Sequence, residues 1–182
     1  MNFYFYCPKE DIYNRFNWKK NYPEDWWHEF KSFCKNAKKK KIKILMGLSP
    51  GLSFDFKTDL KRNKDVQLLV LKFKNLLNAG ADYVALQFDD IPDDFDDKYK
   101  HLDEGKIHAL ICNYVSEKLK KPVFAVPRIY SDELAKNKNN YLKSFFKNLS
   151  FDIFTFYCGE YIVSKQFKTK IDTVKKQLKN KK

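Results

Sequence analysis

Five short apolar segments, separated by amphipathic ones, constrain the fold more than any other feature of the sequence. Buried strands appear as runs of about four to eight apolar or aromatic residues. Such runs occupy residues 2–6, 42–48, 83–88, 123–126 and 152–156. Their starts lie roughly 30 to 40 residues apart, which leaves room for one helix between consecutive parallel strands. The pattern therefore predicts alternating β and α elements.

Helical patterns fill the intervals between these segments. Apolar residues recur at helical spacing, as in Trp26, Phe30 and Ala37, and Gly80 marks a helix end. The helical segments cover residues 26–37, 66–77, 107–115 and 167–178, with a weaker candidate at 136–146. Apolar strands alternating with helices imply a parallel sheet covered by helices. We therefore expect an α/β fold.

Such a sheet is either open and doubly wound or closed into an eight-stranded barrel. The Gly-x-Gly-x-x-Gly dinucleotide fingerprint and the phosphate-binding P-loop are both missing from the sequence, which favours the barrel over the Gly-rich open folds. A closed barrel typically needs about 250 residues, whereas this chain has 182. We expect residues 1–182 to form one incomplete domain, a partial (β/α)8 TIM-like barrel with about five β/α units.

The net charge of +13 raises the question of a nucleic-acid partner. Of the 36 basic residues only Arg15, Arg62 and Arg128 are arginines, although phosphate and base recognition favours the arginine fork. We therefore expect no nucleic-acid partner. No apolar stretch approaches the roughly 20 residues that span a bilayer, and residues 1–10 lack the pattern of a signal peptide. We expect no membrane partner either.

The four cysteines, Cys7, Cys34, Cys112 and Cys158, are scattered and form no Cys-x-x-Cys pair. This spacing supports neither a zinc site nor a disulfide framework and favours a reducing compartment, the cytoplasm. The three histidines form no metal-binding pattern. We expect no metal and no cofactor.

In barrels the chemistry lies at the carboxyl ends of the strands, and one such end carries a serine motif. Gly47-Leu48-Ser49-Pro50-Gly51 matches the Gly-x-Ser-x-Gly nucleophile elbow of α/β-hydrolases. That elbow needs the backbone N–H of the residue after the serine, and Pro50 has none. Residues 51–57 also look like a loop rather than the required helix. We therefore interpret this segment as a shaped loop.

A second strand end carries an aspartate-rich motif, Asp89-Asp90-Ile91-Pro92-Asp93. It fits the Asp-Asp-x-x-Asp pattern with which prenyl diphosphate synthases hold magnesium and a diphosphate. Those enzymes resemble one another as all-helical chains with a second aspartate-rich motif, whereas this copy is single and follows a predicted strand. A magnesium-dependent prenyl diphosphate synthase-like protein remains an alternative.

The same aspartates also fit an acid/base pair. Alternation along the strand places Leu86 and Phe88 on the helix side and Gln87 and Asp89 toward the barrel interior. Asp90 would then begin the loop. Two neighbouring carboxylates disfavour simultaneous ionisation, so one of them can stay protonated and act as a general acid. A solvated acidic loop is the alternative without function.

Five segments at the predicted strand ends follow the same order as the motifs of one known family. They are Tyr6-Cys7-Pro8-Lys9-Glu10-Asp11 with Arg15, Trp18 and Tyr22-Pro23, then Gly47-Leu48-Ser49-Pro50-Gly51-Leu52, Ala85-Leu86-Gln87-Phe88-Asp89-Asp90-Ile91, Val126-Pro127-Arg128-Ile129-Tyr130, and Tyr157-Cys158-Gly159 with Ile162-Val163-Ser164. They resemble the Tyr-Ala-Pro-Lys-Asp-Asp, Ile-Ser-Pro-Gly-Leu, Ala-Leu-Leu-Phe-Asp-Asp-Ile, Pro-Thr-Glu-Tyr and Trp-Thr-Gly segments of the O-GlcNAcase-type β-N-acetylglucosaminidases, glycoside hydrolase family 84. The resemblance covers most of the chain.

This resemblance implies a barrel enzyme that removes β-linked N-acetylglucosamine with retention by substrate-assisted catalysis. The sugar's own 2-acetamido oxygen attacks the anomeric carbon, an exception to the two-carboxylate scheme. By the same resemblance, Asp89 holds and polarises the acetamido N–H, while Asp90 protonates the leaving oxygen and then activates water. Tyr130 would hydrogen-bond the acetamido group and Lys9 would contact a sugar hydroxyl. The implied partner is a glycan or glycoprotein that contains N-acetylglucosamine.

The chain departs from the family pattern at two places that bear on the acetamido pocket. Arg128-Ile129 stands where the family has Thr-Glu before the tyrosine, and Tyr157-Cys158 stands where it has Trp-Thr. Because only five of eight β/α units are visible, a second interpretation stays open, a truncated, inactive barrel that binds a glycan or a protein partner. Open sheet edges would also favour self-association.

Overall fold

The computed structural model describes residues 2–57, 59–92, 95–99, 101–135 and 139–163. Five strands are present within one residue or two of their predicted bounds. They are β1 (Phe3–Tyr6), β2 (Lys43–Leu48), β3 (Tyr83–Gln87), β4 (Val123–Val126) and β5 (Phe154–Thr155). All four neighbouring pairs are parallel, in the order β1-β2-β3-β4-β5. The prediction of a parallel α/β sheet is confirmed.

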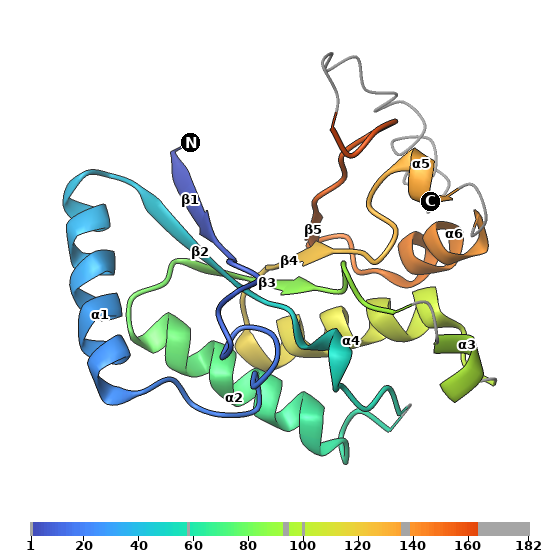
Figure 1. The fold of residues 1–182 in the computed structure, drawn as a ribbon, viewed down its shortest axis with the longest axis horizontal. Helices are drawn as coiled ribbons and strands as arrows, with labels where there is room; N and C mark the ends of the chain where they lie inside the picture. The colour runs from blue at the N-terminus through green and yellow to red at the C-terminus, as the bar shows by residue number, and fades with distance from the viewer. Residues whose placement is uncertain (1, 58, 93–94, 100, 136–138, 164–182) are drawn as a thin grey trace.

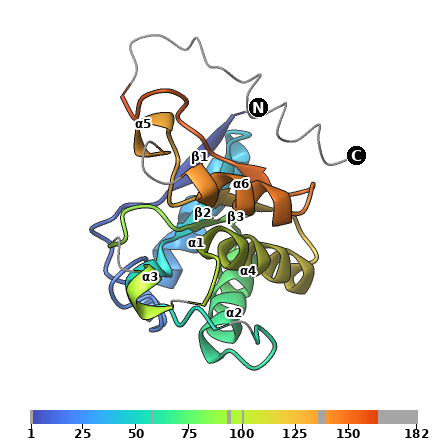
Figure 2. The ribbon, with the colours of Figure 1, turned by 90° about the vertical axis from the view of Figure 1, so that its right-hand side faces the viewer.

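Helices connect these strands, as the periodicity predicts. They are α1 (Glu24–Lys39), α2 (Lys64–Asn78), α3 (Phe95–Lys98), α4 (Glu104–Leu119), α5 (Asp132–Ala135) and α6 (Asn139–Asn148), with a 3-10 turn η1 (Pro50–Leu52). The Asn63 side chain caps α2 by accepting from two backbone N–H groups, and Gly80 follows its end with a φ of 122°. In Figures 1 and 2 the long helices α1, α2, α4 and α6 follow one another along one side of the sheet.

Three short helical elements differ from the sequence-based expectation. Residues 51–57, predicted as loop, begin inside η1, and neither α3 nor α5 was predicted. Each of these elements spans four residues or fewer, which is too short to show a helical period. The weak candidate at 136–146 is found as α6, a few residues further on, whereas the predicted helix at 167–178 lies outside the described residues.

The sheet is strongly curved, because its two outermost strands approach each other across one face. The ring of Phe5 on β1 stacks on that of Phe156, which directly follows β5, with 5.1 Å between centroids. The Phe156 ring also stacks on Phe124 of β4. Two strands separated by three others can touch in this way only if the sheet curls like a barrel wall.

Side chains of β3 alternate as predicted. Phe88, which directly follows the strand, stacks on His108 of α4 with 3.9 Å between ring centroids. The side chains that alternate in step with Phe88 therefore face the helices. Gln87 has the opposite parity, and its Oε1 lies 2.7 Å from where a Cβ on Gly47 would stand. The inner face of the sheet therefore carries Gln87 and, two residues further along the chain, Asp89.

Among the helices that the structure describes, none has the length and apolar composition of a membrane-spanning helix.

Candidate active site

One ammonium group joins the carboxyl ends of three strands. Lys9, which follows β1, places its Nζ 2.8 Å from Oδ2 of Asp89 and 3.7 Å from Oδ2 of Asp90, both of which follow β3. The same Nζ donates a hydrogen bond to Oγ of Ser49, at the end of β2, over 3.1 Å. Parallel strands bring these ends to one edge of the sheet, so residues 40 positions apart in the sequence meet.

The Asp89 carboxylate is buried, with 8% of the residue exposed. Burial raises its pKa, the hydrogen bond and charge of Lys9 oppose that rise, and the negative charge of Asp90 adds to it. One carboxylate oxygen is held by Lys9, whereas Oδ1 is buried and has no hydrogen-bond partner among the described residues. Asp89 therefore presents one free acceptor inside the site.

Asp90 lies in a different environment from its neighbour. Its side chain is about half exposed, and its φ of 55° places the backbone in the left-handed region, which Asp tolerates better than most residues. The guanidinium of Arg15 donates to its main-chain oxygen, which supports this turn. The two aspartates thus offer one buried and one solvent-facing carboxylate.

Tyr130, which follows β4, completes the cluster. Its pKa is raised by burial and then by the negative charges of Asp90 and Asp89, so the phenol lies within electrostatic reach of both carboxylates. The structure gathers the four predicted site residues, Lys9, Asp89, Asp90 and Tyr130, at one end of the sheet. Their catalytic and binding roles remain predictions.

Cys158 and Cys7 also lie within electrostatic reach of Asp89. Burial raises the pKa of both thiols, and the charge of Asp89 adds to this. Neither cysteine forms a disulfide. These neutral thiols are poor nucleophiles at neutral pH.

The loop between β1 and α1 is built around Asp11, which sequence reasoning missed as a structural residue. Its carboxylate accepts from the backbone N–H groups of Tyr13 (2.8 Å) and Asn14 (3.1 Å) and from the Tyr22 hydroxyl (3.1 Å). Asn14 in turn donates to the Gly47 carbonyl of β2 over 2.7 Å. These bonds fix the loop that carries Lys9.

Lys72 of α2 also stabilises the loop between β1 and α1, and the sequence analysis did not identify this role. Its buried ammonium donates to the carbonyls of Tyr13, Trp18 and Lys20 at 2.6 to 2.8 Å. Burial lowers its pKa to about 8. A signal was available in the sequence, because Lys72 lies three residues after the apolar Leu69 and therefore on the buried face of the helix.

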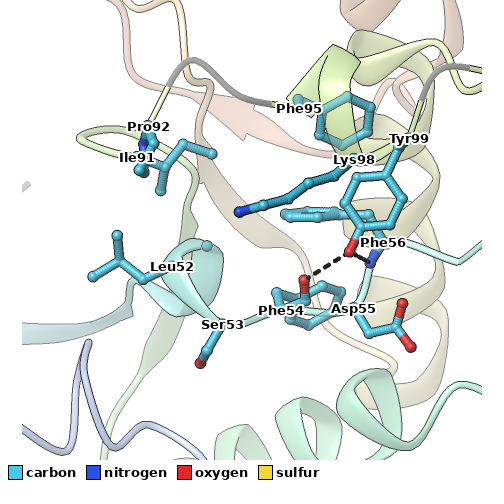
Figure 3. A pocket seen from close by; sticks show the side chains of 11 residues that line it. Leu52, Ser53, Phe54, Asp55, Phe56, Ile91, Pro92, Phe95, Lys98 and Tyr99 are labelled. Atoms are coloured by element: carbon cyan, nitrogen blue, oxygen red, sulfur yellow. Dashed lines mark hydrogen bonds between the residues drawn. The ribbon is translucent and has the colours of Figure 1, made fainter.

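A cavity of about 320 Å³ lies beside the aspartates, between the loops that follow β2 and β3 (Figure 3). Its walls combine apolar and polar side chains, and Lys98 reaches across it. The Tyr99 hydroxyl accepts from the Phe56 N–H over 3.4 Å and donates to the Phe54 carbonyl over 3.5 Å. Ile91 lines it directly after Asp90, but the four clustered residues do not. The cavity is thus a neighbour of the acid/base site rather than the site itself.

The alternative motifs can now be compared with the structure. Ser49 is buried and accepts from Lys9, and the residue after it is Pro50 at the start of η1, so the arrangement of a serine nucleophile elbow is not present here. The parallel sheet also disagrees with the all-helical fold of prenyl diphosphate synthases. Asp93, the last aspartate of that motif, lies outside the described residues.

Comparison with known proteins identifies one family. The sequence model of the β-N-acetylglucosaminidase family matches residues 1–182. Protein O-GlcNAcase of Rattus norvegicus and that of Mus musculus are each 27% identical to this chain over 124 residues. The matched segment is 67% of this chain and 13% of each relative.

Solved structures show the same fold. The structure of CpGH84B matches with a TM-score of 0.83 and 25% identity over 98% of this chain and 32% of the other. A mutant of the Thermobaculum terrenum O-GlcNAc hydrolase matches with a TM-score of 0.81 and 24% identity over 98% of this chain and 39% of the other. These neighbours are TIM barrels, so the predicted TIM-like fold is confirmed. The chain spans about a third of their length.

Proposed function

The chain belongs to the β-N-acetylglucosaminidase family, and on this premise we propose that it supplies the acid/base part of a glycoside hydrolase that releases β-linked N-acetylglucosamine with retention. The observation that supports this most is the gathering of Lys9, Asp89, Asp90 and Tyr130 around one point of the barrel rim. Each residue occupies the position at which the family motif has a residue of the same kind.

In the first step the acetamido oxygen of the bound sugar forms a bond to the anomeric carbon, and the bond from that carbon to the leaving oxygen breaks. Asp90 gives its proton to the leaving oxygen. This role suits the solvent-facing carboxylate, because the leaving group departs and water enters from the open side. This closes a five-membered oxazolinium ring that keeps the acetamido N–H. In the second step Asp90 takes a proton from water, whose oxygen attacks the anomeric carbon; the bond from that carbon to the acetamido oxygen breaks, so the ring opens and the acetamido group is restored.

Asp89 suits the complementary role. Its buried Oδ1 lacks a partner among the described residues, which supports its assignment as the acceptor of the acetamido N–H; accepting that N–H makes the acetamido oxygen a better nucleophile. Lys9 supports the ionised form of Asp89. The Tyr130 hydroxyl hydrogen-bonds the acetamido group, and an N–H of Lys9 turns to a sugar hydroxyl when substrate binds.

The proposed substrate class is a glycan or glycoprotein that carries β-linked N-acetylglucosamine. Two relatives are named O-GlcNAcase and one solved structure is an O-GlcNAc hydrolase, which supports a sugar attached to protein.

The test compares turnover of a fluorogenic N-acetylglucosaminide by the wild-type chain and by Asp90→Asn. Asn adopts the left-handed backbone conformation as readily as Asp, but its amide cannot transfer a proton. We therefore expect a fall in kcat of about a hundredfold or more. The matched control is Asp152→Asn, an exposed aspartate before β5 at the opposite end of the sheet, which should retain wild-type turnover. Wild-type turnover no greater than that of Asp90→Asn would refute catalysis by this chain. Binding of an oxazoline mimic without turnover would instead indicate a glycan-binding domain.

A further inference from the structure

Behind the ends of β3 and β4, a set of buried polar side chains links two helices to the site. The set comprises Glu104 and His108 of α4, Arg128 just after β4, and Tyr141 of α6. Each is at most 8% exposed. None belongs to the proposed acid/base cluster, so their burial needs another explanation.

The Arg128 side chain reaches into the helix layer, toward α4. Its Nε and Nη2 both donate to the Glu104 carboxylate, the second over 2.6 Å, so the pair has the two-pronged geometry that fixes orientation as well as distance. The guanidinium also lies 5.5 Å from the centre of the Tyr141 ring. A buried, two-pronged pair leaves the backbone at Arg128 little freedom.

The hydroxyl of Tyr141 fixes that backbone directly. It accepts a hydrogen bond from the main-chain N–H of Arg128 over 2.9 Å and lies 2.9 Å from Nδ1 of His108. Burial lowers the pKa of His108 well below its usual range, so the ring is neutral and its Nδ1 shares one hydrogen bond with the tyrosine hydroxyl. One hydroxyl therefore connects β4 to α4.

The same set reaches β3 through His108. Its ring stacks on Phe88 with 3.9 Å between centroids and 1° between the planes, and Phe88 directly precedes Asp89. The Phe88 N–H also donates to the Val126 carbonyl of β4 over 2.9 Å. Both strand ends that carry site residues thus rest on one set of contacts.

The helices α4 and α6, which carry three of these buried polar residues, pack closely against each other and so limit their movement. A Cβ on Gly105 would stand only 2.3 Å from the main-chain oxygen of Tyr141, so the two backbones touch there. Ser144 of α6 donates to the Asp103 carboxylate over 2.6 Å at the start of α4. Figures 1 and 2 both show the two helices side by side.

We propose that Arg128, Glu104 and Tyr141 are positioning residues, which hold the end of β4 so that the Tyr130 hydroxyl faces Asp89 and Asp90. The catalytic consequence rests on the proposed function, in which Tyr130 binds the acetamido group. Arg128 stands where the family motif has threonine, so this chain supports its tyrosine with a buried ion pair of its own. The placement of Tyr130 itself can be measured without substrate.

The first test is a double-mutant cycle on turnover. Tyr141→Phe keeps the ring but loses both hydrogen bonds, and we expect it to lower kcat/KM about tenfold, since small misplacements of binding groups are costly. In a Tyr130→Phe background the same change should cost less than about twofold, because Tyr141 acts through Tyr130. Tyr114→Phe is the matched control, since the Tyr114 hydroxyl accepts a hydrogen bond from Gln67 of α2 over 3.2 Å rather than from the end of β4.

The second test follows the ionisation of Tyr130 by ¹³C NMR of the tyrosine Cζ atoms in the free protein. The Tyr130 midpoint should fall toward the ordinary tyrosine value in Tyr141→Phe, because the phenol moves away from the carboxylates, and it should not change in Tyr114→Phe. Arg128→Lys keeps the positive charge but loses the two-pronged guanidinium geometry, and it should also lower the Tyr130 midpoint.

The outcomes separate the two proposals. If the wild-type chain does not hydrolyse substrate but the Tyr130 midpoint responds as described, the proposed function fails and the positioning role stands. If the losses of the two tyrosine variants multiply in full, or if the Tyr130 midpoint is the same in wild type and Tyr141→Phe, the positioning role is overturned.

Discussion

Asp89 and Asp90 are neighbours in the sequence, yet the fold gives their carboxylates opposite surroundings. Strand alternation turns Asp89 inward, where it is buried against Lys9. The left-handed backbone of Asp90 turns the next side chain toward solvent. Residues in such strained conformations concentrate at functional sites. One backbone turn therefore gives the two carboxylates the different surroundings that the proposed roles, a fixed polarising group and a proton-transferring group, require.

Removal of Lys9 tests this division. The charge and hydrogen bond of Lys9 lower the pKa of Asp89 against the effect of burial, so Lys9→Met should raise that pKa further. In the proposed mechanism the ionised form of Asp89 polarises the acetamido group, so the acidic limb of the kcat/KM pH profile should move to higher pH. The pH profile of hydrolysis measures this. Lys57→Met is the control, since Lys57 is exposed and pairs with Asp55; an acidic limb at the wild-type pH in Lys9→Met would contradict the assignment.

At the residue scale, sequence reasoning could place the groups that follow strands but not those that lie on helices. Lys9, Asp89, Asp90 and Tyr130 all follow predicted strands; the residues themselves pointed to the aspartate pair, and the family resemblance added Lys9 and Tyr130. Glu104 could not be linked to Arg128, because the pairing of residues 24 positions apart depends on how α4 packs against the sheet. The partner of a buried polar residue in another element cannot be identified from the spacing of residues in the sequence.

Among the elements, the loop between β1 and α1 depends most on one side chain. Lys72 donates to three carbonyls of that loop and so joins α2 to the segment that carries Lys9. The cost is the burial of a charge, which lowers the pKa of Lys72 from its ordinary 10.5 to about 8.

This burial predicts a pH dependence of stability. Between about pH 8 and pH 10.5 the folded protein binds fewer protons at Lys72 than the unfolded chain does, so this residue makes the free energy of unfolding rise with pH in that window. Lys72→Met removes the titration. The stability of the wild type relative to Lys72→Met, measured by urea unfolding at several pH values, should therefore increase across the window. A difference that is constant or decreases would contradict the buried ammonium.

Strand bounds were predictable for the first four strands and failed for the last. The strands β1, β2, β3 and β4 were placed within one residue, because each is a mainly apolar run bounded by polar or turn residues. The last strand, β5, is shorter than the predicted 152–156 segment, and among the residues that the structure describes it pairs only with β4. Pairing partners, rather than local sequence, set where an outer strand ends.

For the whole molecule, alternation of strands and helices predicted the fold class, but the curvature could be seen only in the structure. The stacking of Phe5 on Phe156 joins the outer strands across the inner face. This contact depends on side chains about 150 residues apart in the sequence, which no local pattern connects. The barrel-like curvature is what brings Lys9, the aspartates and Tyr130 to a common rim.

The outer strands also predict how the chain behaves in solution. Within the described residues, β1 and β5 each have a strand neighbour on one side only, and Phe154 of β5 is 58% exposed. Unpaired edges associate unless charges protect them. We expect concentration-dependent self-association in sedimentation velocity and a shift toward monomer in Phe154→Lys. A wild-type chain that stays monomeric at all concentrations would contradict this prediction.

The central claim is that the sugar's acetamido oxygen, assisted by Asp89, is the nucleophile. The most direct measurement is the hydrolysis rate for a series of aryl N-acetylglucosaminides whose acetyl methyl carries zero to three fluorine atoms. Fluorine withdraws electrons from the acetamido oxygen and weakens it as a nucleophile, so kcat/KM should fall with each fluorine, by about a hundredfold or more over the series. A rate that is the same for all members of the series would contradict the claim.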